Sequence, residues 1–82
     1  MFKNKNNNSN NLCGNKIKEV RQAKQPKMSQ RALADQLQLA GIDLDKNAIQ
    51  RIESGQRFVT DIELVAFSKI LNISLDNLLL DK

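Results

Sequence analysis

The sequence has no His, Trp or Tyr, and only one Cys, one Pro and three Gly among 82 residues. A zinc site needs several Cys or His ligands, so these absences exclude one, and the single Cys13 excludes an intramolecular disulfide. No apolar run approaches the roughly 20 residues of a membrane-spanning helix. The first residues lack the apolar segment of a secretory signal. We therefore expect a cytoplasmic protein with no metal, no cofactor and no membrane partner.

Catalytic groups are equally scarce. Without His, the chain has no Ser or Cys placed beside a general base, and it has no Gly-rich phosphate loop. Asp43 and Asp45 are close in sequence, but a loop residue and a helix cap explain them better than a metal pair does. The sequence therefore predicts that the protein is not an enzyme.

The hydrophobic residues of the chain are mainly aliphatic. Hydrophobic residues make up 40% of it and only three are aromatic, so Leu, Ile, Val and Ala must build one modest core. The period-two alternation of a strand is absent, whereas helical spacing recurs along the chain. These features predict an all-α, compact five-helix domain.

The charges are distributed unevenly around a net value of +4. Residues 1–57 carry 11 Lys and Arg against 5 Asp and Glu, whereas residues 58–82 carry 2 against 4. A basic first part suits a polyanionic ligand, although a basic surface that serves only solubility would show the same balance.

Residues 1–11 are Asn-rich and too polar to pack, so we expect a disordered tail there and the folded domain over 12–82. Lys3 and Lys5 leave two alternatives open for the tail, a floppy terminus or a basic arm that follows DNA.

Five helical segments are expected: three at 12–25, 29–39 and 46–54, a fourth that begins after Thr60 and includes Leu71, and a short fifth that begins after Ser74 and ends near Leu80. Their starts are marked by capping residues, namely Ser29, Asp45, Thr60 with Glu63 in a capping box, and Ser74. Gly55 is expected to end the third segment in the left-handed conformation, and Pro26 to end the first at or before Gln25.

Apolar residues at helical spacing predict the buried faces. In the first segment they are Leu12, Cys13, Ile17 and Val20. In the fourth they are Ile62, Val65, Ala66, Ile70 and Leu71, with Phe67 nearby, and in the fifth they are Leu75, Leu78 and Leu79. Ile42 and Leu44 of the connection at 40–44 should pack back onto the core.

Segment 46–54 has two distinct faces. Ala48, Ile49 and Ile52 face inward at helical spacing, which leaves polar side chains on the outside: Lys46, Asn47, Gln50 and Arg51. A short helix that offers such donors and acceptors near its start fits the major groove of DNA.

The ordered set of motifs resembles the phage-repressor-like (XRE, Cro/repressor type) helix-turn-helix family. The resemblance is carried by 29-SQRALA-34, 48-AIQRIESG-55 and 71-LNISLDNLL-79, together with Ile17 and Arg21, and it covers residues 12–80. It implies a compact lambda-repressor-like bundle in which helices two and three form the DNA-binding unit.

The resemblance also implies roles for individual residues. Gln30 would contact phosphate and help to orient helix three, Lys46, Asn47, Gln50 and Arg51 would lie along the major groove, and Gln56 and Arg57 would hold the DNA backbone. Solvated helix surface is the alternative for Lys46 and Arg51. Arg21 and Glu53 would form a partly buried ion pair between helices one and three. Between Leu37 and Asp45 the chain departs from the family, because its turn is several residues longer.

Two functions are compatible with these observations. The first is a sequence-specific regulator of transcription that binds double-stranded DNA as a homodimer on paired half-sites, because one module buries too little surface to bind tightly alone. Leu78, Leu79 and Leu80 on helix five are the first candidate for the dimer contact, although core packing would explain two of them equally well. The alternative is an antitoxin-like or adaptor module whose main partner is a protein.

Overall fold

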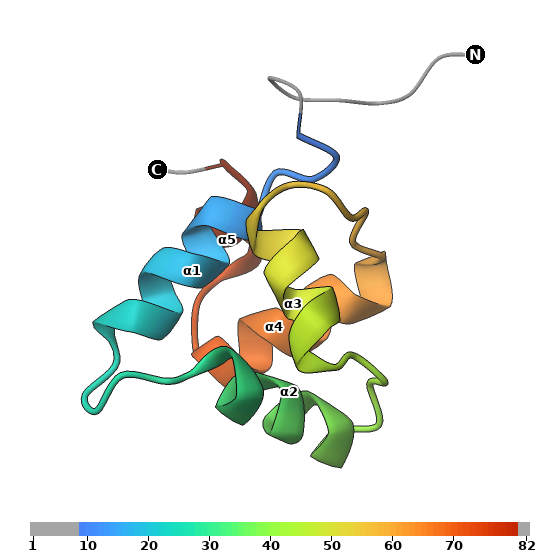
Figure 1. The fold of residues 1–82 in the computed structure, drawn as a ribbon. Coiled ribbons are helices and arrows are strands. Elements are labelled where there is room, and N and C mark those ends of the chain that lie inside the picture. Colours follow the sequence, from blue (N-terminus) through green and yellow to red (C-terminus); the bar gives the residue numbers. More distant parts are fainter. Residues whose placement is uncertain (1–8, 81–82) are drawn as a thin grey trace.

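The computed structural model describes residues 9–80 of the chain. Five helices follow one another in it, joined by short connections (Figure 1): α1 Gly14–Ala23, α2 Gln30–Leu39, α3 Lys46–Glu53, α4 Asp61–Leu71 and α5 Leu75–Leu80. No strand occurs among these residues. The all-α fold with five helices predicted from the sequence is confirmed.

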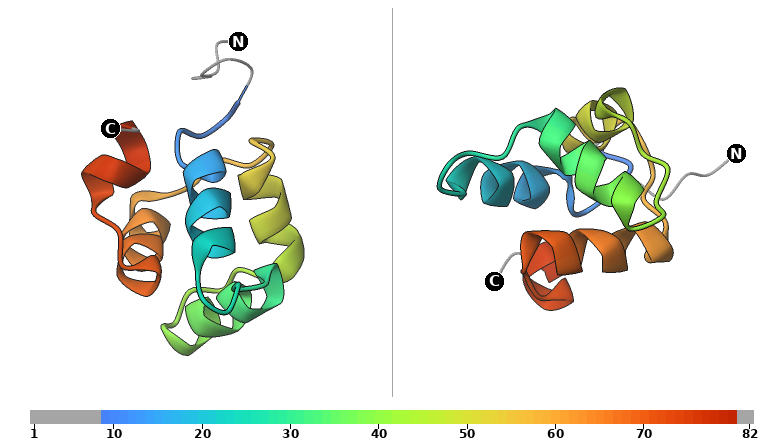
Figure 2. Two further views of the ribbon diagram at one scale, coloured as in Figure 1. Left: turned by 90° about the vertical axis from the view of Figure 1, so that its left-hand side faces the viewer. Right: turned by 90° about the horizontal axis from the view of Figure 1, so that it is seen from below.

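The helices are arranged in layers. Seen from below in Figure 2, α2 and α3 lie on one side of the molecule and α4 and α5 on the other, with α1 between them at one end. Within the part of the chain that the structure describes, no helix is both long and apolar enough to cross a membrane.

The expected capping residues set the helix boundaries. Ser29 Oγ accepts from Ala32 N–H at 3.0 Å, and Asp45 Oδ1 accepts from Ala48 N–H at 2.8 Å. Thr60 and Glu63 complete a reciprocal capping box at the start of α4. Ser74 Oγ accepts from Asn77 N–H at 3.1 Å. Gly55 follows α3 with φ +82°, the left-handed conformation expected for it.

The core lies where the two layers meet α1. Phe67 of α4 is fully buried and contributes the largest side chain. It packs with buried aliphatic residues from all five helices and from the α2–α3 connection, among them Ile17, Leu33, Leu37, Leu44, Ile49, Ile52, Leu71 and Leu78. Leu44 is therefore buried as predicted, and Ile42 packs against the same core.

Helix α1 is shorter than the sequence predicts. It begins at Gly14, not at residue 12, and Leu12 is 55% exposed, so its predicted inward position is wrong. At the other end the backbone turns extended at Lys24, before Gln25 and Pro26. Pro26 disfavours helical backbone in the residue before it, which explains why α1 stops early.

The predicted buried face of α4 is partly wrong. Phe67 and Leu71 are buried, whereas Ile62 is 68% and Val65 42% exposed. At 3.6 residues per turn, positions 62 and 65 lie about 140° and 160° around the helix from Phe67. Once the aromatic ring enters the core, these two side chains must therefore face outward.

The six-residue helix α5 cannot turn all of its leucines inward. Leu78 is buried and Leu79 packs partly against the core, as predicted. Leu75 is 40% exposed, so its predicted place in the core is wrong.

The predicted tail differs from the structure at its end. Asn10 and Asn11 form hydrogen bonds to the segment that follows α3, so they belong to the folded domain. The disorder or basic arm predicted for residues 1–8 lies outside the described residues.

The first prediction concerns the two faces of α4. Phe67→Ala should lower the free energy of unfolding by about 3–5 kcal/mol, because it removes a fully buried ring and leaves a cavity. Ile62→Ala on the same helix is the matched control and should change it by less than about 0.5 kcal/mol. Urea unfolding followed by circular dichroism measures both. Equal losses would show that Ile62 belongs to the core after all.

Candidate nucleic-acid interface

Helix α3 presents a continuous polar face. Lys46, Asn47, Gln50 and Arg51 are all exposed, whereas Ala48, Ile49, Ile52 and Glu53 are buried. The exposed positions follow the spacing i, i+1, i+4 and i+5, so they share one side of the helix. The structure therefore brings four of the predicted DNA-binding residues together on one surface.

A buried ion pair joins α1 to α3. Arg21 Nε and Nη2 donate to the two carboxylate oxygens of Glu53 at 2.8 and 2.9 Å. Arg21 Nη1 donates further to the Met28 carbonyl at 2.9 Å. Both residues are less than 10% exposed. This bidentate pair is the arrangement that the family resemblance implies.

Gln30 extends this network to α2. Its Nε2 donates to Glu53 Oε1 at 3.0 Å, and its side chain is half-buried. Three hydrogen bonds thus converge on the Glu53 carboxylate from α1 and α2. Gln30 is in place to orient α3, which is one of the two roles that the resemblance implies for it.

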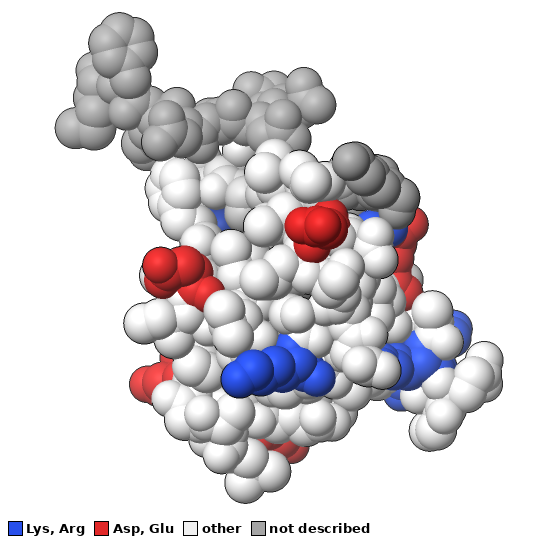
Figure 3. All heavy atoms as spheres, turned by 180° about the vertical axis from the view of Figure 1, so that it is seen from behind, with Lys and Arg blue, Asp and Glu red and all other residues white. Residues whose placement is uncertain are grey.

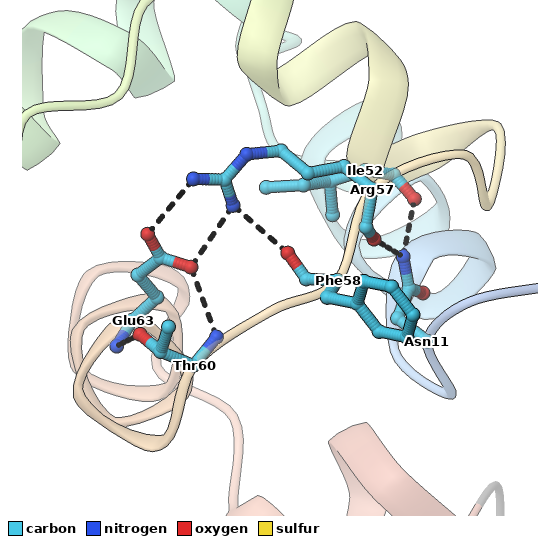
Figure 4. A network of polar contacts seen from close by, with 6 residues as sticks. All are labelled: Asn11, Ile52, Arg57, Phe58, Thr60 and Glu63. Carbon is cyan, nitrogen blue, oxygen red and sulfur yellow. Dashed lines mark hydrogen bonds and ion pairs between the residues drawn. The ribbon is translucent and has the colours of Figure 1, made fainter. Parts of the chain in front are cut away.

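Arg57, in the loop after α3, is engaged within the protein (Figure 4). Its Nη1 and Nη2 donate to the Glu63 carboxylate at 3.0 and 3.2 Å, and Nη1 also donates to the Phe58 carbonyl at 2.9 Å. The side chains of Arg57 and Glu63 are 31% and 13% exposed. This differs from the expectation that Arg57 holds the DNA backbone, whereas Gln56 beside it is exposed.

The environment of Glu63 favours its ionised form. Burial is the largest single influence and would raise its pKa, but hydrogen bonds from Arg57 and Thr60 and the charge of Arg57 together lower the pKa below 4.5. A lowered pKa in the folded state stabilises the fold above the ordinary carboxyl pKa. That stabilisation is lost as the pH falls through the lower, folded-state value.

Two asparagines that the sequence analysis assigned to the tail hold the end of α3. Asn11 Nδ2 donates to the carbonyls of Ile52 and Arg57 at 3.0 and 2.8 Å (Figure 4). Its Oδ1 accepts from Gly14 N–H at 2.7 Å. Asn10 donates from its backbone N–H to the Gly55 carbonyl at 2.8 Å and from Nδ2 to the Gln56 carbonyl at 2.9 Å. We call these two residues the asparagine clamp.

Gly14 allows the clamp to sit this close to α3. A Cβ atom at position 14 would overlap the Ile52 carbonyl oxygen. Only glycine fits where the start of α1 meets the end of α3. The N-cap of α1 is Cys13, so Asn11 lies outside the capping position and no capping rule predicts its bond to Gly14. The carbonyls that Asn11 binds are 41 and 46 residues away in sequence, and no local pattern indicates them.

The long connection between α2 and α3 is anchored at its end. Leu44 is buried and the neighbouring Asp45 caps α3, so the start of α3 is fixed despite the extra residues. Asp43 is exposed.

The rear face of the molecule carries charges of both signs. Viewed from behind in Figure 3, separate cationic and anionic side chains are set in a largely uncharged surface.

No group of three His, Cys, Asp or Glu side chains suited to a metal ion occurs within residues 9–80. The burial of Cys13 raises the pKa of its thiol to about 11, so this thiol stays protonated near neutral pH.

A family model described as helix-turn-helix matches residues 17–78, most of the chain and all of α2, α3 and α4. The chain belongs to the XRE, Cro/repressor-type helix-turn-helix family. No curated protein and no solved structure shows a significant match to it. This helix-turn-helix domain is of a DNA-binding regulatory type that is not typically enzymatic.

The second prediction tests the buried ion pair. Arg21→Ala should lower the free energy of unfolding by about 3–5 kcal/mol, because it leaves the Glu53 carboxylate buried without its partner. Lys18→Ala, exposed on the same helix, should change it by less than about 0.5 kcal/mol. Thermal and urea unfolding measure stability. Unchanged melting with abolished DNA binding would refute the structural role of Arg21.

The third prediction tests the asparagine clamp. Asn11→Asp keeps the shape of the side chain and the acceptor for Gly14 N–H, but it turns both donated hydrogen bonds into contacts between oxygens. We expect a loss of about 1–3 kcal/mol in the free energy of unfolding. Asn15→Asp adds the same charge at an exposed position in the first turn of α1. It should be neutral or slightly stabilising, and an equal loss in both variants would argue against the clamp.

Proposed function

We propose that this helix-turn-helix domain is a sequence-specific regulator of transcription that inserts α3 into the major groove of double-stranded DNA. The observation that carries the proposal is the exposed face of Lys46, Asn47, Gln50 and Arg51 on a helix whose other face is buried. Lys pairs with the guanine acceptors, and Asn and Gln pair bidentately with adenine. A DNA ligand also suits the cytoplasmic location expected from the sequence.

Backbone contacts would flank the base contacts. Gln30, at the first position of α2 and half-buried, retains an amide oxygen and a second N–H beyond its bond to Glu53. Exposed Gln56 lies three residues after the end of α3. Both side chains suit phosphate contacts that fix the orientation of α3. Arg57 is left out of this set because Glu63 binds its guanidinium.

A second copy of the chain would complete the site. An open groove of about 630 Å³ between α1 and α5 is lined by Leu12, Leu78, Leu79 and Leu80 and by Lys16, Lys18 and Glu19. Leu12 and Leu80 are each more than half exposed. An isologous interface must be complementary to itself, and a lining with apolar residues and both signs of charge meets that condition. This supports helix five as the dimer contact.

The fourth prediction is the outcome of selecting bound sequences from a random pool of DNA duplexes at two salt concentrations. We expect a palindrome whose half-sites are centred about one helical turn apart, with affinity falling steeply as salt rises. Weak binding without any enriched sequence would contradict sequence-specific recognition. Binding that is insensitive to salt would favour the adaptor or antitoxin-like alternative.

A substitution on α3 then tests which position of the half-site a side chain contacts. Asn47→Ala should relax the preference at one position of each half-site and cost about 1–3 kcal/mol of discrimination there. Lys69→Ala, exposed on α4, removes a side chain away from α3 and should leave the selected sequence unchanged. Identical preferences for Asn47→Ala and the unmodified protein would exclude Asn47 as a base contact.

A further inference from the structure

The loop after α3 contains Arg57, whose guanidinium is bound by acceptors within the protein. The backbone N–H groups of Gln56 and Arg57 both donate to the Arg51 carbonyl, at 2.8 and 3.3 Å, so the loop stays against the end of α3. Arg51 belongs to the polar face proposed to meet DNA. Arg57 is therefore beside the proposed DNA surface, yet its guanidinium is committed to Glu63 and the Phe58 carbonyl.

Glu63 is held in place to receive Arg57. Its Oε1 accepts from the Thr60 backbone N–H at 3.0 Å, and the Thr60 hydroxyl accepts from the Glu63 N–H at 3.2 Å. The capping box thus fixes the carboxylate in the first turn of α4 (Figure 4). Because the acceptor is already positioned, little side-chain entropy is lost when Arg57 binds it.

The asparagine clamp fixes the other end of the contact. Asn11 Nδ2 binds the Arg57 carbonyl at 2.8 Å, so the backbone at Arg57 cannot swing away from α1 without losing that bond. Only the side chain of Arg57 is free to change its position. To present its Nη1 and Nη2 groups to a phosphate, it would have to give up three hydrogen bonds inside the protein.

We propose that Glu63 competes with the DNA phosphates for Arg57, so that the domain binds DNA with one cation fewer than its sequence offers. Carboxylate and phosphate both bind the planar guanidinium through two parallel hydrogen bonds, and the Nη1–Nη2 edge that Glu63 binds cannot bind a phosphate in the same way at the same time. Glu63 is thus a positioning residue that limits the sequence-independent part of DNA affinity. The inference rests on the DNA-binding function proposed above.

The test measures how the affinity for a short mixed-sequence DNA duplex depends on salt. Each phosphate that a cation neutralises adds about 0.9 to the steepness of log affinity against log salt. Glu63→Gln keeps an acceptor for the Thr60 N–H but removes the charge that holds Arg57. We expect tighter binding at low salt and a slope steeper by up to about 0.9. Adding Arg57→Gln to this variant should abolish the gain.

Asp61→Asn is the matched control. Asp61 lies in the same first turn of α4, is exposed and carries the same charge. Its substitution reproduces the general electrostatic change without touching Arg57, and we expect no steeper slope. An equal increase in Glu63→Gln and Asp61→Asn would overturn the proposal, as would an unchanged slope in Glu63→Gln.

If Glu63→Gln fails to fold, the single variant Arg57→Gln still tests the proposal. The slope should stay at the value of the unmodified protein, because Arg57 is not on a phosphate. A slope shallower by about 0.9 would show that Arg57 already contacts DNA and would overturn the inference. Absence of any salt-dependent binding by the unmodified protein is a different result, because it overturns the DNA-binding proposal and this inference with it.

Discussion

The buried ion pair between Arg21 and Glu53 is the contact on which the position of α3 depends. An eight-residue helix is too short to be stable by itself in water, so its geometry must come from tertiary contacts. Apolar packing of Ile49 and Ile52, both fully buried, holds α3 against the core, but it includes no directional contact that would fix the rotation of the helix. A bidentate pair with distances of 2.8 and 2.9 Å fixes it, because the carboxylate can face Arg21 in only one orientation of the helix.

Other contacts fix the start and the end of α3, which the ion pair does not hold. Asp45 and buried Leu44 determine where α3 begins, which compensates for the long connection from α2. The asparagine clamp binds the Ile52 carbonyl in the last turn of α3, where a helix leaves several acceptors unpaired, and the Arg57 carbonyl in the loop that follows. The polar face of α3 is therefore supported at its start, along its buried side and at its end. Such support keeps the exposed side chains in one arrangement, which the proposed recognition of bases requires.

The sequence predicted what local chemistry determines. Ser29, Asp45, Thr60 and Gly55 mark helix ends through contacts within a few residues, and each was found in the expected role. The family resemblance supplied the pairing of Arg21 with Glu53, which no local rule contains.

The predictions from the sequence failed where the position of a residue depends on groups that are distant in the sequence. Ile62 and Val65 looked like core residues because their spacing is helical, and only the placement of Phe67 decides which face of α4 turns inward. Asn11 looked like part of a polar tail because its partners are on α3 and the following loop. Glu63 was recognised as a cap, but its bond to Arg57 depends on the course of the loop between them.

These pairings change how the charge of the chain should be counted. Of the 11 cations in residues 1–57, Arg21 and Arg57 are neutralised by Glu53 and Glu63. Glu63 comes from the acidic part of the sequence, so this part supplies a carboxylate close to the proposed DNA surface. On α3, Lys46 and Arg51 form no ion pair with any residue in the described range 9–80. In the proposed complex with DNA, these two cations would add affinity, and the neutral amides of Asn47 and Gln50 would add to the discrimination between bases.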